Sequence, residues 1–188
     1  MLHGLLFQLL EACIADPPLE NRYDGFYSKL LTYCFGFDSF DFFITRQSLP
    51  STLPSSDTVD VVVLYILCDS HGRPVLITQV KNDDWVTKAD LRFEADKQMR
   101  LGYDAKLLDS PIPRLWGLSL FGTSLRIYCG DVNNGDIKPA FEDHPNPSSV
   151  LPDDFLKAEW NVNILSQKAF DKMKAIVKDI VDGEAALQ

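Results

Sequence analysis

The sequence predicts an α/β fold in which helices cover a single mixed β-sheet, and two observations support this class. Helical and strand-like hydrophobic patterns follow one another in the order helix, three strands, helix and further strands, with added helices at both ends. The 188 residues are enough for one domain with a proper core and hardly enough for two. We therefore expect a single domain over residues 1–188.

Two helices are expected before the first strand. Apolar residues recur at helical spacing over residues 2–14, which predicts an amphipathic helix. A second helix is expected from near Asp16 to Gly36, because prolines are tolerated in a first turn and glycine commonly ends a helix. Residues 39–47 are rich in strand formers, and residues 48–57 read as a loop that contains two prolines.

Residues 58–68 and 74–82 are two runs rich in β-branched side chains, joined by a turn sequence. Asp and Gly occupy the first and fourth positions of the turn at residues 69–72, as a type I turn favours. This pattern predicts a β-hairpin. If the hairpin is centred on the middle of that turn, residues whose numbers sum to 141 lie opposite each other.

The next element is a long helix. Thr87 and Asp90 resemble a capping box, which predicts a helix from there to about Leu108. Four residues at helical spacing give this helix one inward face. They are Leu91, Ala95, Met99 and Gly102.

A second hairpin and a final helix complete the chain. Residues 114–130 predict two strands that turn at Gly122-Thr123. After a segment rich in Pro, Asn and Asp, an apolar stripe at helical spacing predicts a C-terminal helix at about residues 166–182, with Gly183 as its cap.

The net charge of −9 is unevenly distributed along the chain. Residues 73–126 hold nine Lys or Arg and seven Asp or Glu, whereas the segments on either side are acidic. The whole balance argues against a general nucleic-acid coat or an anionic membrane surface. The central segment still offers basic side chains to a phosphate backbone, among them Arg92 and Arg100.

The bulk properties also predict a compartment. The four cysteines are far apart, and no Cys-x-x-Cys pair exists to build a zinc site, so free thiols in a reducing compartment are expected. We find no signal peptide and no apolar run of the length that a membrane span needs. An intracellular protein with no membrane partner is expected, and the nucleus is one candidate location.

Polar residues interrupt the apolar strands of the first hairpin. In the expected register Asp60 faces Lys81 and Val62 faces Gln79, so Asp60, Gln79 and Lys81 share one face at one end of the hairpin. A carboxylate, an amide oxygen and the main-chain carbonyl of Val80 are hard ligands suited to Mg²⁺. A neighbouring lysine can polarise a water or stabilise charge on a phosphate, which together describes a phosphodiesterase site.

The segments TVDVVVLYIL and VLITQVK, joined by DSHGRP, resemble the core signature of the PD-(D/E)XK nuclease superfamily. In that superfamily an Asp on one strand is followed by Glu-x-Lys on the next, after an initial helix. Gln79 stands where Glu is commonest, and Mrr-type restriction enzymes use Gln-x-Lys at this place. The resemblance covers about residues 19–130 and implies a restriction-endonuclease-like α-β-β-β-α-β core, a mixed sheet flanked by helices. Restriction-like domains also occur in Crinkler-type effectors of eukaryotic microbes, and this sequence resembles those effectors in its general character.

The resemblance implies further functional residues. Members often carry a metal-linked Glu on the first core helix, for which Glu20 is the candidate and Glu11 the second choice. Many also place a Gln on the helix after the lysine strand, and Gln98 lies on the inward face of the expected helix. With Arg92 and Arg100, Gln98 completes the expected set of nucleic-acid contacts.

These residues predict a metal-dependent nuclease that acts on DNA, with Mg²⁺ or Mn²⁺ as its cofactor. Asp60, Gln79 and Val80 would bind the metal. Glu20 would assist, and Lys81 would orient or activate the attacking water. The alternative is a catalytically inactive restriction-like domain that binds a protein partner or acts as an effector module. The net acidity, the Gln in place of Glu and the lack of a proline turn before the Asp favour this alternative. A homodimer remains open in both cases.

Overall fold

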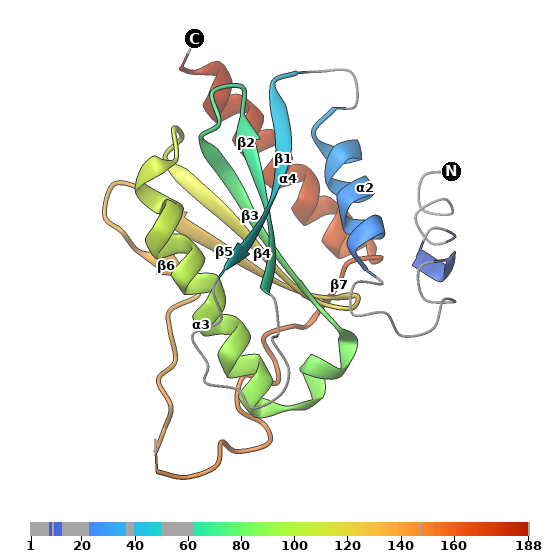
Figure 1. The fold of residues 1–188 in the computed structure, drawn as a ribbon, viewed down its shortest axis with the longest axis vertical. Helices are drawn as coiled ribbons and strands as arrows, with labels where there is room; N and C mark the ends of the chain where they lie inside the picture. The colour runs from blue at the N-terminus through green and yellow to red at the C-terminus, as the bar shows by residue number, and fades with distance from the viewer. Residues whose placement is uncertain are drawn as a thin grey trace.

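The computed structural model describes residues 8, 10–12, 23–36, 40–49, 62–146 and 148–187. The helices and strands labelled in Figure 1 are α2 (Asp24–Cys34), β1 (Phe42–Leu49), β2 (Val62–Asp69), β3 (Pro74–Lys81), α3 (Ala89–Lys106), β4 (Arg114–Phe121), β5 (Ser124–Asp131), β6 (Ile137–Lys138), β7 (Val162–Asn163) and α4 (Gln167–Ala185). Two short 3₁₀ helices, η1 (Asp83–Thr87) and η2 (Leu107–Asp109), flank α3. Among the described residues, none of the helices combines the length and the apolar character that crossing a bilayer requires.

The strands form one mixed, open sheet. Its order is β1-β2-β3-β4-β5-β6, with β7 paired to β5. Strands β3 and β4 are parallel, because the chain crosses over through α3 between them, and the other pairs are antiparallel. The predicted α/β class with a mixed sheet is therefore confirmed.

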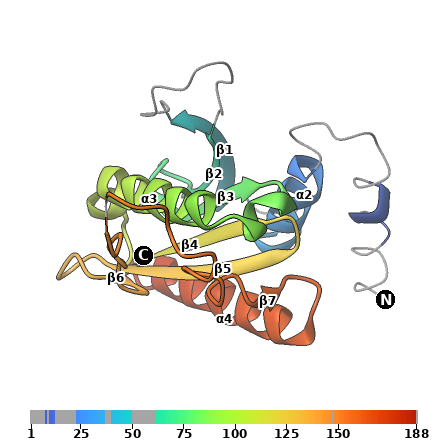
Figure 2. The same ribbon diagram turned by 90° about the horizontal axis from the view of Figure 1, so that it is seen from below.

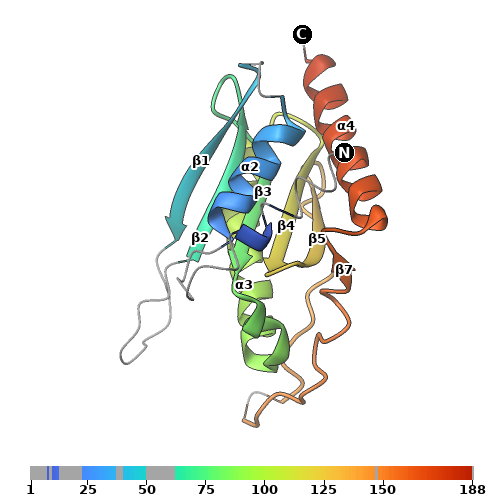
Figure 3. The same cartoon turned by 90° about the vertical axis from the view of Figure 1, so that its right-hand side faces the viewer.

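Helices cover both faces of the sheet. Helix α3 lies on one face, and α2 and α4 lie on the other (Figures 2 and 3). Side chains alternate between the two faces along each strand, so β4 directs Leu118 and Leu120 to the α2–α4 side and Leu115 to the α3 side. The larger apolar core lies between the sheet and α2–α4, and a smaller one lies beneath α3.

Both predicted turns are present. In the turn between β2 and β3 the N–H of Gly72 donates to the carbonyl of Asp69 at 3.0 Å, as the type I turn requires. Strands β4 and β5 turn at Gly122-Thr123, where Gly122 has a φ of +55° that suits glycine. Helix α2 ends just before Gly36, whose φ is +89°.

The predicted register of the β2–β3 hairpin is wrong by two residues. Gln79 faces Leu64 rather than Val62. Two irregularities cause the shift: Asp69 pairs its N–H with the carbonyl of Arg73 at 2.9 Å, and a bulge lies between Leu67 and Cys68. A shift of two residues leaves every side chain on its predicted face.

Two helix ends also differ from the prediction. The hydroxyl of Thr87 donates to the carbonyl of Asp84 at 2.7 Å instead of capping a helix, so α3 begins later, after Lys88. Gly183 does not cap the last helix. It lies inside α4 against Ile112, where a side chain would not fit. Most of the predicted helix at residues 2–14 and of the loop at residues 48–57 lies outside the described residues.

Candidate functional site

The predicted site residues fall into two groups. Asp60 and Glu20 lie outside the described residues, and Glu11, the second choice, is exposed. Gln79, Val80 and Lys81 form the end of β3. Gln79 and Lys81 share the α3 face, whereas Val80 packs into the opposite core.

Gln79 is 0% exposed, and both atoms of its amide are engaged. Its Nε2 donates to Oε1 of Gln98 on α3 at 2.9 Å. Its Oε1 accepts from the hydroxyl of Ser119 on β4 at 3.0 Å. The prediction that Gln98 faces inward is therefore confirmed. The contact also ties together two strands and the helix above them.

These bonds belong to a longer series of hydrogen bonds in which each donor precedes its acceptor in the same direction. Trp160 Nε1 donates to the Ser119 oxygen at 3.2 Å, and this leaves the Ser119 proton for Gln79. At the other end Gln98 Nε2 donates to Glu94 Oε1 at 3.1 Å. We call this set, Trp160, Ser119, Gln79, Gln98 and Glu94, the glutamine relay. Because it starts at a pure donor and ends at a carboxylate, the orientation of both amides is fixed.

A buried ionic cluster lies next to the glutamine relay on the α3 side of the sheet. We call the relay and this cluster together the polar layer. Ser119 pairs across the sheet with Arg126 on β5, whose Nη1 binds Oδ1 of Asp96 at 2.9 Å. The hydroxyl of Tyr128 donates to the same Oδ1 at 2.8 Å, and burial raises the pKa of that tyrosine well above its ordinary value. Arg100 Nε binds Oδ2 of Asp96 at 2.9 Å. Asp96 is 0% exposed, and these two guanidinium groups and the tyrosine hydroxyl compensate its buried charge.

Lys81 lies at the open end of the site. Its Nζ is 4.2 Å from the centre of the Trp85 ring, a cation–π contact. Trp85 is buried beside Phe121, with ring centres 6.1 Å apart. Lys81 is half-buried and thus retains access to solvent.

Arg92 does not fit the expected contact with a phosphate backbone. Its side chain is 0% exposed, and its three nitrogen atoms each donate to a main-chain carbonyl. The acceptors are Val86 at 2.7 Å, Asp153 at 2.7 Å and Phe155 at 2.9 Å. Burial lowers the pKa of Arg92, and Asp153 and Asp154 oppose this effect. Arg92 therefore anchors the segment after β6 to helix α3.

Arg100 and Gln98 are also occupied within the protein. Besides Asp96, Arg100 donates to the carbonyl of Pro139 at 2.8 Å. Its side chain is only 14% exposed. Gln98 belongs to the glutamine relay. The structure therefore gives each of the three expected nucleic-acid contacts an internal partner.

Gln79, one expected ligand of the divalent cation that the resemblance implies, does not present its oxygen to such an ion. Gln79 Oε1 faces Ser119, and reaching a cation would break the relay. Within the described ranges, no group of three or more His, Cys, Asp or Glu side chains is arranged to hold a metal ion. The carboxylates that would complete the set, Asp60 and Glu20, lie outside those ranges.

The described cysteines offer no activated nucleophile. Cys34, Cys68 and Cys129 are free thiols. Burial raises the pKa of Cys34 to about 11 and also raises those of the other two. A raised pKa keeps a thiol protonated at neutral pH and weakens it as a nucleophile.

Sequence reasoning missed several members of the polar layer. Ser119 and Arg126 each interrupt an otherwise apolar strand, the same signal that identified Gln79. Asp96 carries no such signal, because charged residues are common on helices. Trp160 lies in an irregular segment 41 residues from its partner Ser119.

Comparisons with models of protein families, with curated proteins and with solved structures found no match to this chain. The chemistry of the site itself is therefore the basis for a function.

Proposed function

We propose that the chain is a restriction-endonuclease-like domain that does not cleave phosphodiester bonds and instead serves as a protein-binding module. The observation that carries this proposal is the state of Gln79. Its oxygen, the expected metal ligand, is buried and accepts from Ser119, while its nitrogen donates to Gln98. Releasing the oxygen for a cation would leave a buried hydroxyl without an acceptor, which costs free energy.

Charge supports the same proposal. The chain carries −9, and the basic residues expected to bind phosphates are engaged inside the domain, as Arg92 and Arg100 show. Affinity for nucleic acid comes mainly from cations that reach phosphates. The remaining surface charge is better suited to a protein partner than to DNA.

The test is a cation titration of the whole chain followed by thermal unfolding. A ligand that binds only the folded state raises the melting temperature. We expect millimolar MgCl₂ or MnCl₂ to shift the melting temperature no more than NaCl of matched ionic strength, both in the wild type and in Asp60→Asn. A rise specific to Mg²⁺ or Mn²⁺ that Asp60→Asn removes would overturn the proposal.

A second candidate is the metal-dependent nuclease, and the position of Lys81 favours it. Lys81 keeps solvent access on the same face as Gln79, at the end of β3. Strand β2, which Asp60 precedes by two residues, begins at that end of the hairpin. A lysine in such a place can stabilise charge that develops on a phosphate.

Supercoiled plasmid DNA distinguishes the two candidates. For the binding module we expect no nicking with Mg²⁺ or Mn²⁺ above that of buffer. Nicking that Asp60→Ala and Lys81→Ala each abolish, and that the matched exposed-lysine control Lys88→Ala keeps, would establish the nuclease. Nicking of equal strength in all four proteins would indicate a contaminant and contradict the nuclease.

A further inference from the structure

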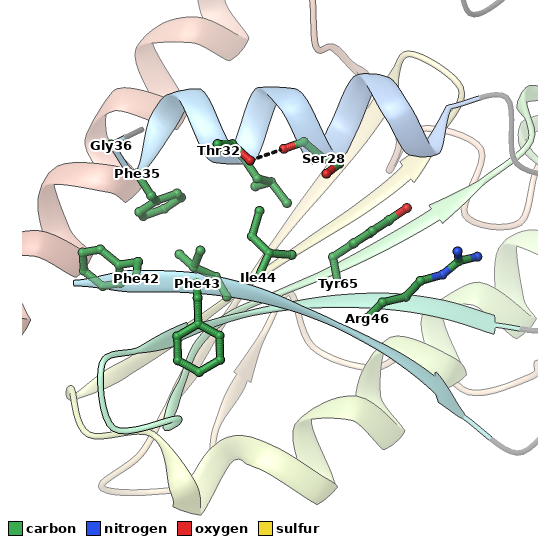
Figure 4. A pocket seen from close by; sticks show the side chains of 11 residues that line it. Ser28, Thr32, Phe35, Gly36, Phe42, Phe43, Ile44, Arg46 and Tyr65 are labelled. Atoms are coloured by element: carbon green, nitrogen blue, oxygen red, sulfur yellow. Dashed lines mark hydrogen bonds between the residues drawn. The ribbon is translucent and has the colours of Figure 1, made fainter. Parts of the chain in front are cut away.

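A groove of about 440 Å³ separates helix α2 from the edge of the sheet. Leu31 of α2 and Phe35, the residue that follows this helix, line the groove together with Phe42 and Ile44 of β1 and Leu67 of β2. Figure 4 shows Phe35 on one side of the groove and Phe42 and Ile44 on the other. The volume falls in the range of about 300–1,000 Å³ that binding pockets occupy. Figure 4 shows Phe42 and Ile44 directed toward the helix and Phe43 directed away from it.

The outer edge of β1 runs along this groove. All eight residues of β1 pair with β2 in an unbroken register, and β1 is the end strand of the sheet. Within the described part of the chain, no strand pairs with its other edge. Alternate backbone N–H and C=O groups of an edge strand point outward and can bond to another strand.

Strand β1 lacks the usual features that prevent strand addition. Edge strands are commonly protected by lysine, proline or a bulge. The strand FFITRQSL contains no lysine, proline or carboxylate, and its pairing shows no bulge. Its one charged residue is Arg46, on the groove side. On the opposite face, Phe43 is 44% exposed.

We propose that β1 and the α2–β1 groove bind an extended segment of another protein by strand addition. Only an extended backbone supplies hydrogen-bonding groups at the spacing of the β1 edge. Alternate side chains of the added strand would enter the groove, because successive residues of a strand point to opposite faces. The groove thus selects side chains, and the strand edge contributes affinity through the main chain.

The lining of the groove indicates the side chains of the partner. Phe35, Phe42 and Ile44 give it apolar surface beside the hydroxyls of Ser28 and Thr32, and this surface suits two aliphatic or aromatic residues at alternate positions. Arg46 follows on the same face, and its side chain is 53% exposed although it pairs with Asp24 at 3.2 Å. A carboxylate at the third alternate position complements this guanidinium.

Charge also decides between a foreign partner and a second copy of the chain. Each of two copies would carry a net charge of −9 over the whole chain. Self-association is therefore opposed by repulsion, and β1 itself carries no carboxylate to place beside Arg46 of another copy. A segment of a different protein with the apolar–apolar–acidic pattern avoids the repulsion between two copies and also supplies the carboxylate for Arg46.

This inference gives the proposed binding role a surface and a partner chemistry, but it does not depend on the state of the Gln79 site. The groove lies on the α2 side of the sheet and the glutamine relay lies on the α3 side. Loss of peptide binding would therefore remove this inference alone, whereas the cation and plasmid assays test the proposed function separately.

The experiment uses fluorescein-labelled synthetic peptides and the full chain, with anisotropy as the readout. Each peptide alternates threonine with phenylalanine, isoleucine and glutamate, and it is made in both sequence directions. Two further versions carry N-methyl groups on one or the other set of alternate amides. We expect saturable binding that one N-methylated version retains and the other loses by about tenfold or more. Equal binding of both versions, or no binding of any peptide, would overturn strand addition.

A matched pair of variants on α2 locates the site. Thr32 lines the groove, and Thr32→Trp should fill it and weaken peptide binding by about tenfold or more. The neighbouring Tyr33 is 55% exposed and lies outside the groove, so Tyr33→Trp should bind like the wild type. Circular dichroism checks that both variants fold. Equal binding by both variants would place the peptide elsewhere and contradict the proposal. A dimer by light scattering that Thr32→Trp dissociates would replace the foreign segment with a second copy.

Discussion

Nε2 of Gln79 on β3 donates to Oε1 of Gln98 on α3 across 2.9 Å, and this bond can run in only one direction. Ser119 supplies a proton to the other end of the first amide, and Glu94 accepts a proton from the other end of the second. Reversing either amide would place two acceptors or two donors face to face. The pair therefore behaves as one unit whose polarity is set by its neighbours.

A glutamate at position 79, the residue commonest there in the PD-(D/E)XK signature, should destabilise this protein. In Gln79→Glu the new carboxylate would face Oε1 of Gln98, and turning Gln98 would direct that oxygen at Glu94. We expect a loss of about 3 kcal/mol in the free energy of unfolding, measured by urea denaturation at pH 7.

A second substitution should repair the defect. With Glu94→Gln added, Gln98 can turn, donate to the new carboxylate and accept from the amide at position 94. We expect the double variant to recover more than about 1 kcal/mol of the loss, and Glu94→Gln alone to cost less than that. Additive losses in the double-mutant cycle would show that the relay does not couple these sites.

Arg92 should matter for stability rather than for binding nucleic acid. Arg92→Met keeps an unbranched apolar stem but leaves three carbonyls without their donor. We expect a loss of about 3 kcal/mol or more in urea denaturation, because buried acceptors would lose charged partners. The exposed Lys88→Met serves as the control and should stay within about 0.5 kcal/mol of the wild type. A loss below about 1 kcal/mol in Arg92→Met would contradict the anchoring role.

The β2–β3 turn should contribute to the acid sensitivity of the fold. Burial opposes ionisation of Asp69, but the N–H and guanidinium of Arg73 and the N–H of His71 bind its carboxylate, and its pKa lies below the ordinary 3.8. A carboxyl whose pKa is lower in the folded state stabilises the fold at pH values above its unfolded pKa. That contribution is lost as the pH falls through the folded pKa.

The measurement is the free energy of unfolding from pH 7 down to pH 2 in the wild type and in Asp69→Asn. We expect the variant to be less stable by about 1 kcal/mol at pH 7, with the difference shrinking below pH 4. Asp171→Asn, an exposed aspartate on α4, is the control. A difference that stays constant over the whole range would show that the charge of Asp69 contributes nothing.

Two glycines should respond in opposite ways to the same substitution. A Cβ at Gly117 would lie 2.6 Å from the hydroxyl of Tyr103, which donates to the carbonyl of Leu115. Gly117→Ala should therefore cost about 1–3 kcal/mol. Gly25, in the first turn of α2, has open space around that position, and Gly25→Ala should gain about 0.5–1 kcal/mol. Thermal unfolding of both variants checks the pair, and a gain at Gly117 would contradict the packing described beneath α3.

Local signals in the sequence predicted the elements well and their relative placement less well. Turn residues such as Gly72 and Gly122 act within four residues, so both hairpins could be read from the sequence. The register of β2 against β3 depended on a bulge between Leu67 and Cys68, and neither residue type indicates a bulge. Gly183 fits the usual cap of a helix, but it packs against Ile112 from a different part of the chain.

The candidate site shows the same difference between local signals, which the sequence reveals, and contacts between distant segments, which it does not. An isolated polar residue in an apolar strand identified Gln79, and the helical period of α3 placed Gln98 on the inward face. The period could not tell that Arg92 is directed into the protein, because an arginine on a helix is usually solvated. Two of its three carbonyl partners, Asp153 and Phe155, belong to an irregular segment more than 60 residues away.

The polar layer beneath α3 also distinguishes the native strand pairing from its near competitors. Gln79 and Ser119 stand in register on the parallel strands β3 and β4. A slip of β4 by one residue would turn Ser119 into the apolar core beneath α2 and α4, and Leu118 or Leu120 would face the amide of Gln79. Parallel strands of mostly apolar residues can otherwise pair in several ways at similar cost. The contact between Gln79 and Ser119 thus penalises a misaligned β4, and it favours the one alignment in which these two side chains bond to each other.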